Sequence, residues 1–150
     1  MSFDLDHAFD RVDRFFLHNT MCALGINERF VQLLSTINNQ CKSRILINGH
    51  ISPAFPIERS VRQGDPISMI LFVIYLQPLL MNLENICNPD DLIVAYADDI
   101  TLISTSVQVI QRAREIFAEF QLAAGAMLNV QKTVSIDVGH INGNNRLLVP

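Results

Sequence analysis

Apolar residues recur along this chain with two different periods, one typical of strands and the other of helices. Alternating apolar and polar residues predict a strand, whereas apolar residues three and four apart predict an amphipathic helix. In chain order, these patterns predict a strand at 3–5, helices at 15–24 and 27–38, strands at 44–47 and 55–59, a helix at 67–83, strands at 92–95 and 100–103, a helix from 106 to about 125, and a loop with a short strand at 128–136. This order predicts an α+β fold in which helices cover one face of a small antiparallel sheet.

Residues with strong preferences for turns and helix ends stand at these boundaries. The Asn48-Gly49 pair predicts a tight turn that lets the strand at 55–59 pair with the strand at 44–47. Pro78 lies inside the third predicted helix and is expected to kink it. The remaining boundary residues are Asn27, Asp65 and Ser106 as helix N-caps, Pro66 at a first helical position, and Gly25 and Gly125 at helix ends.

The composition indicates one folded domain without an overall attraction for polyanions. The chain has 150 residues, of which 49% are hydrophobic and 17% charged, and its formal net charge is −4. A local exception follows the second predicted helix, where Lys42, Arg44, Arg59 and Arg62 outnumber the single acid Glu58. This basic segment is either a contact for nucleic acid or an ordinary solvated hairpin.

The three cysteines argue against a disulfide or zinc framework. Cys22, Cys41 and Cys87 are odd in number, widely separated and without a Cys-x-x-Cys pair. We therefore expect a reducing, intracellular compartment, with nucleus and cytoplasm both open, and the N-terminal residues lack the pattern of a secretory signal. Polar residues interrupt the longest apolar stretch, at 67–83, so we expect a buried helix and no membrane contact.

Paired acids at the predicted tip of the last hairpin are the clearest indication of chemistry. Asp98 and Asp99, preceded by Tyr96 and Ala97, separate two apolar strands. If the first strand lies beside this hairpin, Asp4 joins the two acids at one edge of the sheet. Three neighbouring carboxylates repel one another unless they bind cations, and Mg²⁺ prefers oxygen ligands. Two such ions are suited to phosphoryl transfer, which is the reaction class that the acids indicate.

Four blocks of the sequence resemble, in order, motifs of the reverse transcriptases, in particular the polymerases of non-LTR (LINE-like) retrotransposons. Residues 3–12 resemble motif A, residues 62–68 motif B, residues 96–99 motif C and residues 128–133 motif D. Four ordered blocks are far more specific than any single one of them. The resemblance implies a polymerase palm.

The resemblance covers residues 1–136 and implies a partial reverse transcriptase domain, followed by a weakly organised tail at 137–150. It implies RNA-directed DNA synthesis with two Mg²⁺ or Mn²⁺ ions, an RNA template, a DNA primer and deoxynucleoside triphosphates. The implied roles are Asp4, Asp98 and Asp99 as metal-binding catalytic acids, Lys132 as a proton donor near the pyrophosphate, Phe9 as a steric gate against a ribose 2′-hydroxyl, Arg62, Gln63 and Gly64 at the nucleotide and template, and Tyr96 near the primer end. The simpler explanations are core packing for Phe9 and Tyr96, a plain turn for Gln63 and Gly64, and solvated cations for Arg62 and Lys132.

The sequence departs from the family pattern at three residues and in its extent. His7 stands where motif A commonly has a basic residue, Ser60 where a glycine usually precedes motif B, and Met69 where a proline usually follows. Fingers and thumb segments are expected to be missing, so we expect low activity of the isolated chain and poor solubility or dependence on a partner chain. The alternative function is a catalytically inactive remnant or a nucleic-acid-interaction module. An RNA-dependent RNA polymerase agrees less well with Phe9.

Overall fold

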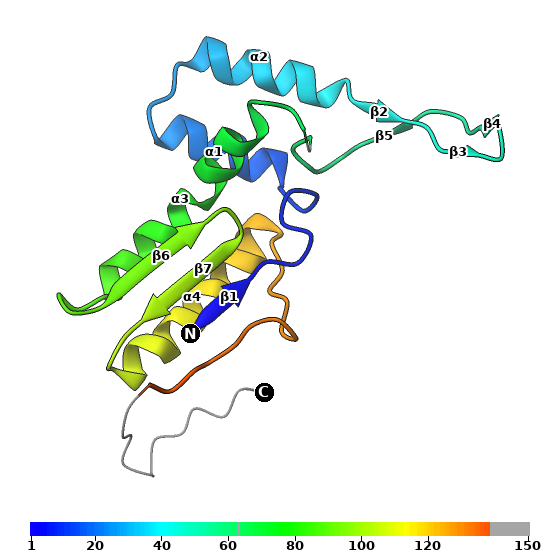
Figure 1. The fold of residues 1–150 in the computed structure, drawn as a ribbon. Coiled ribbons are helices and arrows are strands. Elements are labelled where there is room, and N and C mark those ends of the chain that lie inside the picture. Colours follow the sequence, from blue (N-terminus) through cyan, green and yellow to red (C-terminus); the bar gives the residue numbers. More distant parts are fainter. Residues whose placement is uncertain (63, 139–150) are drawn as a thin grey trace.

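A computed structural model describes residues 1–62 and 64–138 of the chain (Figure 1). Its helices are α1 (Arg14–Ala23), α2 (Glu28–Asn39), α3 (Ser68–Ile86) and α4 (Val107–Ala124). Its strands are β1 (Ser2–Asp4), β2 (Lys42–Ser43), β3 (Leu46–Ile47), β4 (His50–Ile51), β5 (Phe55–Pro56), β6 (Leu92–Tyr96) and β7 (Asp99–Ile103). Helices and strands are interspersed along the chain, as the sequence predicts.

The central sheet has three antiparallel strands in the order β1-β7-β6, and α3 and α4 lie along one of its faces (Figure 1). Ile100 and Leu102 of β7 are fully buried in the core. On β1, the Phe3 ring stacks on Phe117 of α4 with ring centroids 4.0 Å apart. Burial of each such side chain stabilises the fold by roughly 1.5–3 kcal/mol, so helices and sheet hold each other in place. The predicted fold class, a small antiparallel sheet with helices on one face, is confirmed.

The opposite face of the sheet, which α3 and α4 do not cover, is open, and every second side chain of a strand points to it (Figure 1). Leu92 and Val94 of β6 and Ile103 of β7 are exposed. The register pairs Leu92 with Ile103 at one end of the hairpin and Tyr96 with Asp99 at the other. The open face is therefore apolar at one end and acidic at the other.

Capping residues define most helix ends as the sequence predicts. The side chains of Asn27 and Ser106 accept hydrogen bonds from first-turn N–H groups of α2 and α4. Gly125 ends α4 in the left-handed conformation with φ +73°. Asp13 caps α1 in the same way, although the sequence pattern did not single it out.

The predicted start of the third helix is wrong. Asp65 and Pro66 were expected to be its N-cap and first residue, but α3 begins at Ser68. The Asp65 carboxylate instead accepts a hydrogen bond from the Ile67 N–H at 3.1 Å and closes a separate turn. Aspartate competes for nearby backbone donors in this way, so a turn and a helix start look alike in sequence.

Helix α3 is longer than predicted, since it continues through Pro78 to Ile86. Its 19 residues are long and apolar enough to cross a membrane by length and composition alone. Leu79 and Leu83 are nevertheless fully buried, and the helix packs against α1 and α4. These contacts place one face of α3 in the core, and the expected lack of membrane contact stays a prediction.

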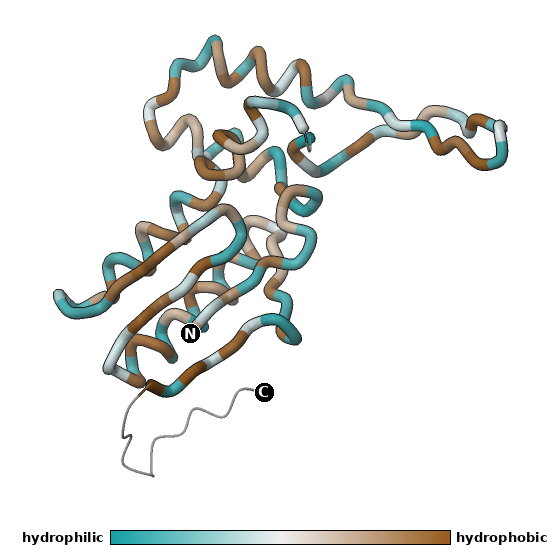
Figure 2. Tube along the Cα trace, in the orientation of Figure 1, coloured by the Kyte–Doolittle hydropathy of each residue, from teal (hydrophilic) through white to brown (hydrophobic). Residues whose placement is uncertain are grey.

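The segment between α2 and α3 forms a narrow hairpin that projects from the rest of the molecule (Figure 1), and we call residues 42–56 the hairpin arm. β2 pairs with β5 at its base, and β3 pairs with β4 across the Asn48-Gly49 turn. The predicted pairing of 44–47 with 55–59 is therefore wrong. Residues next to a tight turn pair at a smaller loop-closure cost than residues farther from it, which favours the pairing of β3 with β4. Figure 2 shows hydrophobic stretches along the outer part of the arm.

Candidate active site

The β6–β7 hairpin carries two of the predicted acids at its tip. Tyr96 and Asp99 are the last paired residues, so Ala97 and Asp98 form a two-residue turn. Ala97 has φ +52°, a left-handed value that short hairpin turns use and that costs a non-glycine residue about 1–2 kcal/mol. Asp98 is half-buried and Asp99 is exposed. The turn therefore holds both carboxylates at the acidic end of the open face.

The third predicted acid lies on the neighbouring strand. β1 pairs with β7 in a register that places Asp4 directly opposite Asp99. The Asp4 side chain is 17% exposed, and its buried Oδ2 atom has no hydrogen-bond partner in the described part of the chain. Carboxylates opposite each other on adjacent strands repel, and a buried acceptor without a partner is destabilising. This edge of the sheet therefore favours a cation.

One cation of the chain itself reaches Asp4. The Lys132 Nζ atom lies 3.6 Å from Asp4 Oδ2, although the lysine side chain is 71% exposed. Asn129 accepts hydrogen bonds from the backbone N–H groups of Lys132 and Thr133, which closes a turn around the lysine. The Asn129 N–H also donates to the Asp4 carbonyl at 2.8 Å. Asn129, which the sequence offered only as motif context, therefore joins the lysine to the aspartate.

The segment after α4 extends the sheet beyond β1. Ser2 and Val134 exchange two backbone hydrogen bonds, and Leu5 pairs with Leu128 in an isolated bridge. The short strand predicted within 128–136 thus exists only as two bridges with a turn between them. The turn between the bridges, closed by the bonds of Lys132 and Thr133 to Asn129, places the lysine at the sheet edge beside Asp4.

The donor set suits a hard divalent cation. Asp4, Asp98 and Asp99 all offer carboxylate oxygens, the ligands that Mg²⁺ and Mn²⁺ prefer. Asp4 Oδ2 accepts no hydrogen bond among the residues described, and the Lys132 ammonium group, 3.6 Å away, is the charge that a bound cation would displace. In residues 1–62 and 64–138, no three His, Cys, Asp or Glu side chains already form a metal site. The acids fit the ions by chemistry and register, and their side chains have to turn towards a common point to bind them.

Phe9 lies at the boundary between core and surface. Its half-buried ring stacks on Phe72 of α3 with ring centroids 4.5 Å apart. Its carbonyl accepts a hydrogen bond from the Val61 N–H, immediately before the predicted motif B turn. Core packing therefore occupies one face of the ring, and the implied role as a steric gate stays a prediction.

The other predicted substrate contacts are described in part. Gln63 lies outside the described residues. Gly64 has a φ of +87°, which favours glycine. A Cβ atom at this position would have no atom within 4 Å, so the backbone conformation and not a close neighbour accounts for the glycine. Tyr96 is 81% exposed, and Arg62 is also exposed. No hydrogen bond or ion pair between described residues joins Arg62 or Tyr96 to the three carboxylates.

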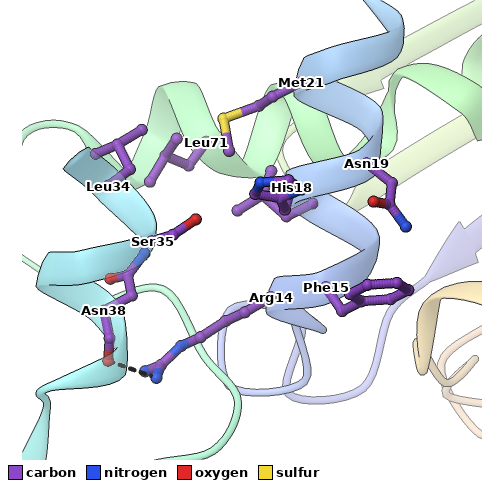
Figure 3. A pocket seen from close by; sticks show the side chains of 10 residues that line it. Arg14, Phe15, His18, Asn19, Met21, Leu34, Ser35, Asn38 and Leu71 are labelled. Carbon is purple, nitrogen blue, oxygen red and sulfur yellow. Dashed lines mark hydrogen bonds between the residues drawn. The ribbon is translucent and has the colours of Figure 1, made fainter. Parts of the chain in front are cut away.

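Arg14 joins the end of α2 to the segment that precedes the predicted motif B turn, and sequence inspection missed it. Its guanidinium donates to the carbonyls of Asn38, Ile57, Arg59 and Ser60 at 2.6–3.2 Å. Figure 3 shows the bond to Asn38 beside a cavity of about 370 Å³ that α1 and α2 line. Its acceptors lie 24 to 46 positions away in the chain, so no local pattern distinguishes it from a solvated arginine.

An open antiparallel sheet with carboxylates at one end, backed by helices, is the architecture of a polymerase palm. The family model for "Reverse transcriptase (RNA-dependent DNA polymerase)" matches residues 1–139, and the chain belongs to the reverse transcriptase family. It is 30% identical over 149 residues to the transposon TX1 uncharacterized 149 kDa protein of Xenopus laevis, covering 94% of this chain and 11% of that protein. It is 28% identical over 151 residues to a retrovirus-related Pol polyprotein from the type-1 retrotransposable element R2 of Popillia japonica, covering 95% and 21%. The predicted resemblance to non-LTR retrotransposon enzymes is confirmed.

Solved telomerase structures share the fold. Apo telomerase from Candida tropicalis, truncated from its C-terminal domain, matches with a TM-score of 0.77 and 17% identity over 97% of this chain and 32% of that chain. Telomerase from the same organism in complex with a TWJ fragment of telomeric RNA matches with a TM-score of 0.76 over 90% of this chain and 25% of that chain. This chain spans between 11% and 25% of the length of the curated relatives, which are the TX1 protein and the Pol polyproteins of R2 elements.

Proposed function

We propose that this chain is the palm of an RNA-directed DNA polymerase of retrotransposon origin, which adds deoxynucleotides to a primer 3′-hydroxyl. The observation that carries the proposal is the strand register that sets Asp4 opposite Asp99, with Asp98 in the adjoining turn and Lys132 beside Asp4. Membership of the reverse transcriptase family supports the reaction class.

In this proposal, Asp4, Asp98 and Asp99 hold two Mg²⁺ or Mn²⁺ ions. When bound, such ions lower the pKa of the attacking hydroxyl and stabilise negative charge on the transferring phosphoryl group and the leaving pyrophosphate. The acids position the reaction because they stand on two paired strands and a two-residue turn, which restrict their movement. Lys132, already beside Asp4, donates a proton or a hydrogen bond to the departing pyrophosphate.

Phe9 selects the sugar in this proposal, because its ring fills the space that a ribose 2′-hydroxyl would need. Its stack on Phe72 supports this role, since a ring packed against a fully buried partner cannot easily move aside. Arg62, Gln63 and Gly64 bind the nucleotide and template, and the exposed Tyr96 contacts the primer end from the open face.

The proposed partners are an RNA template, a DNA primer and deoxynucleoside triphosphates, in an intracellular setting. The telomerase relative of this fold whose structure includes telomeric RNA supports RNA as a partner. Because the curated relatives are several times longer, fingers and thumb segments or a partner chain complete the substrate cleft.

Primer extension on an RNA template tests the proposal, using the complete polypeptide that contains these residues. Asp98→Asn keeps the side-chain shape and removes one charge, and we expect the rate to fall on the order of a hundredfold, as for other preorganised electrostatic groups. Asp90→Asn removes the same charge from an exposed loop before β6 and is expected to leave the rate unchanged. Equal rates for Asp98→Asn and the unmodified protein contradict the proposal.

Two further results separate the alternatives. Salt-sensitive RNA binding without any extension by the unmodified protein favours an inactive remnant or a nucleic-acid-interaction module. Replacement of Phe9 by valine is expected to raise ribonucleotide incorporation about tenfold or more, because a pocket discriminates weakly once its steric block is removed. Efficient ribonucleotide incorporation by the unmodified protein favours an RNA polymerase instead.

A further inference from the structure

The sulfur of Cys41 holds the guanidinium of Arg62. Arg62 Nη2 donates to Cys41 Sγ at 3.1 Å. The arginine is exposed, whereas the cysteine is only 4% exposed. The Cys41 thiol donates its own hydrogen to the Ile37 carbonyl at 3.2 Å, in the last turn of α2. With the hydrogen directed there, the sulfur lone pairs remain available to the arginine.

Main-chain bonds set the position of Cys41 independently of Arg62. The Cys41 N–H donates to the Asn38 carbonyl at 3.1 Å, and the Cys41 carbonyl accepts from the Ile57 N–H at 3.1 Å. Arg14 donates to these same two neighbours, at 2.7 Å to the Asn38 carbonyl and 2.6 Å to the Ile57 carbonyl. Cys41 is therefore held by the end of α2 and by Ile57, just after the hairpin arm, and Arg14 of α1 binds both of these neighbours.

Arg62 begins the predicted motif B turn, and its backbone is anchored close to Phe9. The preceding residue, Val61, is 2% exposed and donates to the Phe9 carbonyl at 3.1 Å. Among described residues, the only hydrogen bond of the Arg62 side chain is the one to Cys41. A long arginine side chain loses up to about 2 kcal/mol of rotamer entropy when it is immobilised. A fixed acceptor reduces that loss before any ligand arrives.

We propose that Cys41 is a positioning residue for Arg62, and that its sulfur orients the guanidinium towards a phosphate of the incoming nucleotide or of the template. The inference rests on the proposed function and assigns a role to a residue outside the four motif blocks. Cys41 itself touches no substrate. Because the effect is preorganisation of a binding group, it strengthens substrate binding and leaves the chemical step unchanged.

Steady-state primer extension and equilibrium template–primer binding by the complete polypeptide test this role. Cys41→Ala is expected to raise either the KM for deoxynucleotide or the Kd for template–primer about three- to tenfold, with kcat nearly unchanged. The constant that rises identifies which phosphate Arg62 binds. Cys41→Ser retains an acceptor and is expected to restore most of the affinity, and Cys22→Ala, at an exposed cysteine on α1, is the matched control.

A double-mutant cycle separates positioning from loss of folding. In the Arg62→Ala background, Cys41→Ala is expected to have no further effect on KM or Kd, because its partner is already gone. Three results overturn the inference. The first is additive changes in KM or Kd in the double variant, and the second is a lowered kcat with unchanged KM and Kd. The third is equal defects in Cys41→Ala and Cys41→Ser. Thermal unfolding of each variant identifies misfolding. If Cys41→Ala misfolds, the cycle is carried out with Cys41→Ser and Arg62→Ala instead. Extension that survives Asp98→Asn contradicts the proposed function, while the binding cycle still tests Cys41.

Discussion

Ser60 adopts a backbone conformation that suits glycine. Its φ is +92°, in the left-handed region, and the family resemblance predicts a glycine at this position. Hydrogen bonds hold the residue there, since its N–H donates to the Val12 carbonyl at 3.0 Å and its carbonyl accepts from Arg14 Nε at 3.2 Å. The departure from the family pattern therefore has a physical consequence, which is local strain next to the motif B turn.

Replacement of Ser60 by glycine is expected to stabilise the protein by about 0.5–1 kcal/mol. Relief of the left-handed strain exceeds the extra unfolded-state entropy that glycine brings. Urea denaturation measures the change in the free energy of unfolding. Ser135→Gly, at a loop residue without positive φ, is the control and is expected to be neutral or destabilising. A destabilising Ser60→Gly would show that the serine is not strained.

Lys132 competes with any divalent cation for Asp4, because its ammonium group lies 3.6 Å from Asp4 Oδ2. Lys132→Met is expected to tighten Mn²⁺ binding about two- to fivefold, since an exposed ion pair contributes up to about 1 kcal/mol. Mn²⁺ titration followed by electron paramagnetic resonance measures the change. Lys42→Met, on the hairpin arm, is the matched control. Unchanged or weaker binding by Lys132→Met counts against competition at Asp4.

At the scale of elements, one side chain fastens three separate segments. Arg14, at the start of α1, donates to carbonyls at the end of α2 and in the segment that leaves the hairpin arm. Burial lowers the pKa of Arg14, and the nearby positive charge of Arg62 contributes in the same direction, although Cys41 opposes it. An arginine surrounded by carbonyls fixes the direction of the arm and, through it, the place of the motif B turn.

Arg14→Ala is expected to destabilise the fold by about 2–4 kcal/mol, because several partly buried carbonyls lose their donor. Arg14→Lys has one donor group in place of the planar fork and is expected to recover only part of this stability. Chemical denaturation measures both variants. Arg112→Ala, at a 51% exposed arginine paired with Glu115 on α4, is expected to leave stability nearly unchanged. If Arg14→Ala lowers the free energy of unfolding no more than Arg112→Ala does, the proposed structural role of Arg14 is wrong.

At the scale of the whole molecule, apolar side chains are exposed on several elements, and the hairpin arm carries a group of them on two short strands. Leu46, Ile47 and Ile51 on the arm are 64–67% exposed. Two-stranded hairpins with exposed apolar edges are marginal by themselves and prone to associate. We therefore expect the isolated 150-residue chain to self-associate through this arm.

Leu46 and Ile51 face each other across β3 and β4, which permits a charge-neutral test of this expectation. The double variant Leu46→Glu/Ile51→Lys keeps the net charge and adds a cross-strand ion pair. It is expected to raise the concentration at which light scattering detects self-association by about threefold or more. Leu122→Gln removes a single exposed leucine from α4 and is expected to change nothing. If the double variant self-associates at the same concentration as the unmodified chain, another surface mediates the association.

Local patterns in the sequence determined much of this protein. The Asn27 and Ser106 caps, the Asn48-Gly49 turn, the acid-tipped hairpin and the alternation of buried and exposed residues on β7 follow from preferences within a few residues. The same local chemistry led to the wrong start of α3, because Asp65 serves a turn as well as it would serve a helix. Four ordered motif blocks were enough to indicate the reverse transcriptase family, which the comparisons confirm.

Only the tertiary structure decided which distant residues meet. The pairing of Asp4 with Asp99 depends on the register of strands that lie far apart in the chain, and the contact between Lys132 and Asp4 depends on a turn bonded to the edge of β1. The acceptors of Arg14 and the sulfur beside Arg62 are likewise brought in by packing. Sequence periodicity reports which side of an element is buried, whereas these contacts arise from the hydrogen bonds and packing between elements.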